Sequence, residues 1–244
     1  MRNIALTLSY DGTNYHGWQF QPELPTVQGA LSDAITAICG EPRRLTGCGR
    51  TDAGVHALTY CANFETDATI PADRLPYALN SRLPRDISVS AAADVPPDFN
   101  AILSCNRKEY VYKLYSGDVH DPFRHSYAYF YPRALDLDAI RRAAAHFVGT
   151  HDFAAVRSVG TVTRTSVRTV FHFDITQDAD TTTFAVCADG FLYNMARALV
   201  GTLLYVSEGK IDADAIPALL ESRNRTLAGP TMPPCGLYLN RVWY

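Results

Sequence analysis

The chain has 244 residues, with 22 lysines and arginines against 25 aspartates and glutamates, and its formal net charge is −3. A content of 47% hydrophobic and 19% charged residues is that of an ordinary globular protein and excludes disordered and fibrous classes. The length allows one large or two small domains with a genuine core. The acidic balance argues against binding to nucleic acid through bulk charge, although it leaves room for local basic surface.

The basic residues are nearly all of one kind. Only three are lysines, and the others are arginines, whose planar guanidinium binds phosphate through two parallel hydrogen bonds. A bias in genomic base composition would produce the same excess of arginine, so both explanations stay open.

Neither a membrane segment nor a metal site is expected. The apolar run at the N-terminus is broken by Asp11 before any cleavage-site pattern, and the most apolar later stretch, residues 195–206, is far short of a span. Six cysteines are spread singly, without a Cys-x-x-Cys pair or a Cys/His cluster at metal spacing. We therefore predict a cytoplasmic protein with reduced thiols and no metal.

Periodicity predicts alternating strands and helices in the first part of the chain. Apolar and polar residues alternate over residues 4–10, which predicts a half-buried strand ending in a turn at 11–13. Thr26 is the predicted N-cap of a helix whose apolar residues repeat at helical spacing until Gly40. Strands are then predicted at 43–46, 60–65, 87–93 and 107–115, with a helix at 72–82.

The second part of the chain repeats this mixture. Helices are predicted at 136–148, 191–207 and 212–221, and strands at 165–175, 183–188 and 237–243. Short hairpin-like links between strands favour an α+β fold of two packed, sandwich-like halves with largely antiparallel sheets over a doubly wound parallel sheet. We predict an N-terminal half of residues 1–103 and a C-terminal half of residues 104–244.

One glycine-rich segment stands out as a candidate for chemistry. Residues 47–57 read Gly-Cys-Gly-Arg-Thr-Asp-Ala-Gly-Val-His-Ala, so three glycines bracket Arg50 and Asp52. A lone Gly-x-Gly is a weak signal for phosphate binding, and Asp52 with His56 at i, i+4 could form an acid–base pair or part of a metal site. An ordinary strand-to-loop connection with a solvated arginine is the alternative.

The same segment resembles the signature of the bacterial tRNA pseudouridine(38–40) synthases, the TruA family. Further motifs of that family follow in order along the whole chain. They are Tyr-Asp-Gly-Thr at 10–13, Gly-Trp-Gln at 17–19, Lys-Glu-Tyr-Val-Tyr at 108–112, Phe-Leu-Tyr-Asn-Met-Ala-Arg at 191–197 and Gly-Leu-Tyr-Leu at 236–239. Five ordered motifs are far more specific than any one of them. The resemblance implies the pseudouridine synthase fold, with an active-site cleft between the two halves.

By this resemblance, Asp52 is the catalytic aspartate of an enzyme that isomerises uridine without metal or organic cofactor. The reaction breaks the C1′–N1 bond, turns the uracil ring and joins C1′ to C5. A carboxylate can capture C1′, remove a 2′ proton or add to C6 of the base, and the sequence leaves these three routes open. Each requires an ionised Asp52, which a nearby cation favours. The resemblance assigns Arg197 as that cation.

The resemblance also implies substrate contacts and partners. Tyr110 is expected to stack on the extruded base and Arg50 to hold the flipped nucleotide. Glu109 and Val111 stand where family members often carry basic residues, which would reduce positive charge beside the cleft. The expected partners are the anticodon stem-loop of tRNA, modified at positions 38, 39 and 40, and a second copy of the chain in a homodimer. Two rivals are a non-catalytic RNA-binding module and a metal-dependent hydrolase using Asp52 and His56.

Overall fold

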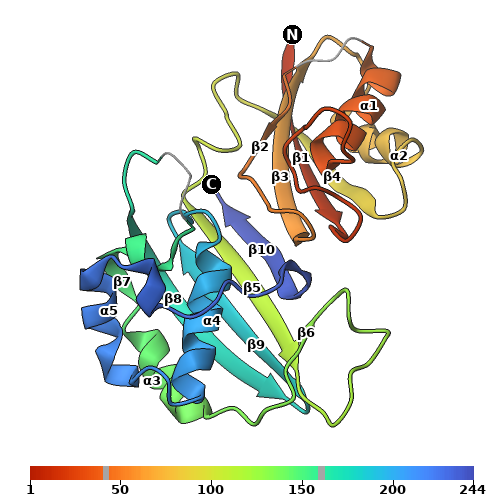
Figure 1. The fold of residues 1–244 in the computed structure, drawn as a ribbon. Helices are drawn as coiled ribbons and strands as arrows, with labels where there is room; N and C mark the ends of the chain where they lie inside the picture. Colours follow the sequence, from red (N-terminus) through yellow and green to blue (C-terminus); the bar gives the residue numbers. More distant parts are fainter. Residues whose placement is uncertain (41–43, 159–162) are drawn as a thin grey trace. The chain divides into compact units, whose positions relative to one another are not determined.

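The computed structural model describes residues 1–40, 44–158 and 163–244, which form two compact units (Figure 1). Unit 1 contains residues 1–106 and 238–244, and unit 2 contains residues 107–237. The predicted division at 103/104 differs from these units at the end of the chain, because residues 238–244 group with the N-terminal part. No helix within the described ranges is long and apolar enough to cross a membrane.

Unit 1 is a sheet with strand order β4-β1-β3-β10 and β2 beside β3. Its pairs are antiparallel except for the parallel β3–β10 pair. Two α-helices accompany this sheet (Figure 1). The elements of unit 1 are β1 (Arg2–Tyr10), α1 (Val27–Cys39), β2 (Thr46–Gly47), β3 (His56–Thr66), α2 (Leu75–Asn80), β4 (Ile87–Val95) and β10 (Leu237–Trp243).

The local sequence explains the ends of the first strand and helix. Ile4, Leu6 and Leu8 are fully buried in β1, as their alternation predicts. Thr26 caps α1 by accepting a hydrogen bond from a backbone N–H of the first turn, and Gly40 ends the helix with φ 83°. The predicted strand at 43–46 lies partly outside the described residues, and the strand found in this region is β2.

Within unit 2 the strands have the order β5-β9-β8-β7 and are antiparallel, with a short parallel β6 beside β5. Helix α3 contacts both α4 and strand β8. The elements of unit 2 are β5 (Arg107–Tyr115), β6 (Tyr129–Phe130), α3 (Leu137–Ala145), β7 (Gly149–Asp152), β8 (Val167–Asp178), β9 (Thr181–Ala188), α4 (Met195–Ser207) and α5 (Ile216–Ser222). The predicted α+β class with largely antiparallel sheets is confirmed.

Helix α4 is bounded by two polar residues. Asn194 has φ 61°, which a right-handed helix cannot contain, so α4 begins at Met195 and not at the predicted residue 191. Glu208 follows its other end, where Lys210 and Tyr131 lie 2.5 and 2.8 Å from its carboxylate oxygens. Hydrogen bonds from Lys210 and Tyr131 lower the pKa of Glu208.

Candidate active site

Asp52 lies in the loop between β2 and β3, and this loop is tied to the segment that follows β1. Asp52 is half-buried, whereas Arg50 is exposed. The backbone N–H of Trp18 donates to the carbonyl of Thr51 at 3.2 Å, and that of Gly54 donates to the carbonyl of Tyr15 at 3.1 Å. The chain is therefore anchored immediately before and shortly after Asp52.

Two glycines allow these segments to approach each other. A Cβ atom on Gly12 would lie 2.0 Å from the carbonyl oxygen of Val55. One on Gly17, which has φ +86°, would lie 2.3 Å from the carbonyl oxygen of Thr51. Both contacts are with backbone, so any side chain at either position would push the Asp52 loop away. The motifs around Gly12 and Gly17 thus shape the loop that carries Asp52.

His56 closes the C-terminal side of this loop. It is only 2% exposed, and its ring stacks on Tyr238 of β10 with 4.7 Å between ring centroids. The N–H of Gly12 donates to Nδ1 of His56 at 3.0 Å. The Asp11 carboxylate lies 3.2 Å from the same nitrogen.

The N-terminal side of the loop rests on stacked aromatic rings. Trp18 and Tyr60 stack with 4.1 Å between ring centroids, and the Tyr60 hydroxyl donates to the carbonyl of Gly49. A Cβ on Gly47 would lie 2.1 Å from the Tyr60 hydroxyl oxygen, which explains the glycine there. Aromatic packing and backbone hydrogen bonds thus hold both sides of the loop.

Tyr110 and Tyr112 lie on one face of β5 in unit 2 but have different surroundings. The ring of Tyr110 meets Phe191 edge-to-face with 4.8 Å between ring centroids. The hydroxyl of Tyr112 donates to the carbonyl of Pro233 at 2.9 Å, and burial raises the pKa of Tyr112. Tyr112 therefore has a packing role.

The reduced charge expected beside Tyr110 lies on the other face of the strand. Glu109 precedes Tyr110 in β5, so its side chain points to the opposite face of the sheet. Its carboxylate lies 2.8 Å from Nε2 of His172 on that face. Its negative charge is therefore on the face of the sheet opposite to Tyr110, and the reduced positive charge beside the cleft stays a prediction.

Arg197 is in the first turn of α4, where polar groups orient its guanidinium. Nε donates to the carbonyl of Met232 at 2.5 Å, and Nη1 donates to the side-chain oxygen of Asn194 at 2.7 Å. Asn194 is itself held, because its amide donates to the hydroxyl of Ser158 at 2.8 Å. Arg197 is half-buried and does not simply extend into solvent.

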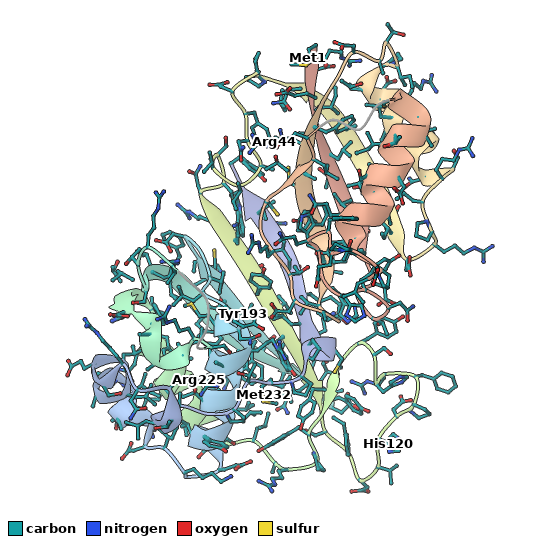
Figure 2. The ribbon with its side chains drawn as sticks, turned by 45° about the horizontal axis from the view of Figure 1, so that its top comes forward. Met1, Arg44, His120, Tyr193, Arg225 and Met232 are labelled. Carbon is teal, nitrogen blue, oxygen red and sulfur yellow. The ribbon has the colours of Figure 1, made fainter. Side chains whose placement is uncertain are left out.

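The segment that carries Met232 is packed against α4 by a contact between two backbones. A Cβ on Gly201 would lie 1.8 Å from the carbonyl oxygen of Pro230. The N–H of Gly229 donates to the hydroxyl of Thr202 at 3.0 Å, and Arg225 donates to the carbonyl of Gly229 at 2.7 Å. Figure 2 labels both Arg225 and Met232, at the two ends of this segment.

Each unit thus presents its own set of predicted site residues. Arg50 and Asp52 share one loop of unit 1, and Tyr110 and Arg197 belong to β5 and α4 of unit 2. The sequence did not single out Asn194 or Met232 as supports of Arg197, because hydrogen bonds made by a backbone carbonyl or by an asparagine leave no spacing pattern. Among the described residues, no three His, Cys, Asp or Glu side chains form a group suited to a metal ion.

Comparison with known proteins gives a match over nearly the whole chain. Residues 7–102 and 143–244 match the family described as tRNA pseudouridine synthase. Proteins named tRNA pseudouridine synthase A from Caldicellulosiruptor bescii and Caldicellulosiruptor saccharolyticus are 46% and 47% identical over 244 residues. A protein of the same name from Acetivibrio thermocellus is 46% identical. In all three cases the alignment covers 100% of both chains.

Proposed function

Because the chain belongs to the tRNA pseudouridine synthase family, we propose that it modifies uridines 38, 39 and 40 of the anticodon stem-loop of tRNA in the cytoplasm. It is an isomerase that converts uridine in tRNA into pseudouridine. The reaction exchanges a C1′–N1 bond for a C1′–C5 bond and consumes no oxidant or reductant. The protein must therefore supply a nucleophile or base, a means of holding the extruded nucleotide and a group that keeps the carboxylate ionised.

Asp52 is the proposed catalytic carboxylate. The observation that carries this assignment is the anchoring of its loop, where hydrogen bonds to Thr51 and from Gly54 hold the backbone on both sides of Asp52. A group held in this way can meet the sugar or base of an extruded uridine without first being ordered. Attack at C1′, removal of a 2′ proton and addition to C6 all remain routes for this carboxylate.

Arg197 is the proposed partner that keeps Asp52 ionised. Its guanidinium is oriented by Met232 and Asn194, and an arginine stays protonated at neutral pH. Tyr110 is proposed to stack on the uracil, since its ring lies edge-on to Phe191 near the start of α4. The exposed Arg50 is proposed to hold the phosphate of the extruded nucleotide.

A homodimer is the proposed functional assembly, in agreement with the family resemblance. Analytical ultracentrifugation at micromolar concentration tests this directly. A single species with the mass of one chain would contradict the proposal.

Release of tritium from C5-labelled uridine in tRNA tests the activity and the role of Asp52 together. The wild-type chain should release tritium, with or without EDTA, and Asp52→Ala should release none. Asp33→Asn is a matched control, because it removes a carboxylate from the exposed side of α1, and it should retain full activity. Transfer RNAs with cytidine at positions 38, 39 and 40 should release no label.

Two outcomes would refute the proposal in different ways. Turnover by Asp52→Ala at the wild-type rate would remove this residue from the chemistry. Binding of tRNA without tritium release by the wild-type chain would favour a non-catalytic RNA-binding module.

A further inference from the structure

Exposed arginines fall into two groups in the described part of the chain. Several lie against a carboxylate, and their positive charge is locally balanced; these pairs are Arg74–Asp73, Arg133–Glu208, Arg141–Asp138, Arg142–Asp214 and Arg223–Asp152. Arg44, Arg50, Arg82, Arg85, Arg164 and Arg241 are also exposed, and none of them forms an ion pair with another described residue; of these, Arg50, Arg82 and Arg85 lie in two neighbouring loops of unit 1. Their charge is available to a ligand.

The loops carrying these three arginines lie at one end of the unit 1 sheet. Residues 81–86 connect α2 to β4, and the N–H of Asp11 donates to the carbonyl of Asp86 at 2.9 Å. The hydroxyl of Tyr15 donates to the Asp86 carboxylate at 2.6 Å, while the carbonyl of Tyr15 accepts from Gly54 in the Asp52 loop. One residue, Tyr15, thus links the Arg85 loop to the Asp52 loop.

The carboxylates at this end take part in hydrogen bonds within the protein. Asp11 accepts from the N–H and the hydroxyl of Thr13 at 2.9 and 2.5 Å, and Asp86 accepts from Tyr15. Both side chains are partly buried, whereas Arg82 and Arg85 are exposed. The three arginines at this end are therefore more exposed than Asp11 and Asp86, which are held by hydrogen bonds within the protein.

We propose that Arg82 and Arg85 bind phosphates of the tRNA backbone next to the uridine that Asp52 attacks. With Arg50 they form an arginine track, defined by these three residues, along one end of unit 1. A guanidinium binds phosphate through two hydrogen bonds and carries no sequence preference, which suits an enzyme that serves several neighbouring uridines. This inference rests on the proposed function, because it takes the tRNA of that active site as the ligand.

The salt dependence of tRNA binding by the full chain tests the track. Each of Arg82→Ala and Arg85→Ala should make the slope of log K against log[salt] shallower by about one. The loss of affinity between about 50 and 200 mM salt should then be about threefold smaller for each variant than for wild type. Arg82→Lys and Arg85→Lys keep the charge and should keep the wild-type slope.

Arg74→Ala is the matched control. Arg74 is an exposed arginine of the same unit, but it is paired with Asp73 at 3.6 Å. It follows Ile70 by four residues, and the carbonyl of Ile70 accepts from Arg2 at the start of β1, the opposite end of the sheet. Arg74→Ala removes the same charge and should leave the slope unchanged.

Wild-type slopes for Arg82→Ala and Arg85→Ala would overturn the inference. A change in the slope of Arg74→Ala as large as theirs would also overturn it, because it would indicate an effect of net charge alone. Tritium release by the wild-type chain is measured on the same tRNA. Its absence would refute the proposed function, whereas normal release with unaltered slopes would refute only the arginine track.

Discussion

Replacing His56 by phenylalanine removes one hydrogen-bond acceptor beneath the Asp52 loop and keeps an aromatic ring. The N–H of Gly12, which is buried, loses its partner Nδ1 at 3.0 Å. A buried donor without a partner costs about 1–3 kcal/mol. The stack on Tyr238, of a kind worth about 0.5–1.5 kcal/mol, is retained. We expect the free energy of opening this loop to fall by about 1–3 kcal/mol.

Amide hydrogen exchange measures this opening directly. Since about 1.4 kcal/mol is tenfold in an equilibrium constant, the amides of Gly12 and Gly54 should exchange roughly 5- to 140-fold faster in His56→Phe. Single-turnover isomerisation should slow as well, because Asp52 is less often in place. His56→Asn is the control, since its amide oxygen can accept from Gly12 while the stack on Tyr238 is lost.

Two results would contradict this reasoning. Wild-type exchange at Gly12 in His56→Phe would show that the hydrogen bond does not hold the loop. Equal acceleration at Gly12 in His56→Phe and His56→Asn would show that the ring matters and the acceptor does not.

Other predictions concern unit 2. Asn194→Gly keeps φ 61° accessible but removes a hydrogen bond to Arg197. Because a hydrogen bond to a charged group contributes about 1.5–3 kcal/mol, the single-turnover rate should fall about tenfold or more. Gly201→Ala should lower the urea midpoint, because its Cβ would lie 1.8 Å from the carbonyl of Pro230; unchanged or higher stability, normal for alanine in a helix, would contradict that contact. Glu208→Gln should lower the Tm at neutral pH. Because folding lowers the pKa of Glu208 from 4.5, the carboxylate stabilises the fold above pH 4.5, and this stabilisation disappears as the pH falls below that value. A difference in Tm between wild type and Glu208→Gln that does not change with pH would contradict this prediction.

Most elements could be predicted from the sequence, because their signals are local. A stretch rich in tyrosine and valine predicted β5, and the cap at Thr26 and the glycine at 40 predicted the ends of α1. Strands β6 and β7 were missed, since segments of two and four residues have too few positions to show a period. The start of α4 was placed too early because the apolar pattern continues through a backbone turn at Asn194.

In the candidate site, too, only the features with a local sequence signal could be predicted. The loop of Arg50 and Asp52 was visible as a run of glycines and charges within a few positions. The supports of that loop and of Arg197 come from residues far along the chain, such as Gly12 against Val55 and Met232 against Arg197. Contacts of this kind depend on the tertiary fold, so no local sequence pattern predicts them.

The grouping of residues 238–244 with unit 1 has a consequence for folding during synthesis, because unit 1 is complete only when the last strand has been translated. Tyr238 pairs with His56 across β10 and β3, and the hydroxyl of Tyr244 donates to the carbonyl of Ala101 at 2.8 Å. A chain leaving the ribosome carries Asp52 early but lacks the strand beside His56 until all of unit 2 has been synthesised. Translation that stops within unit 2 therefore yields a protein that has the proposed catalytic residue Asp52 but lacks the strand that pairs with His56. A product truncated before β10 leaves His56 and Ala57 of β3 without their parallel neighbours Tyr238 and Leu239.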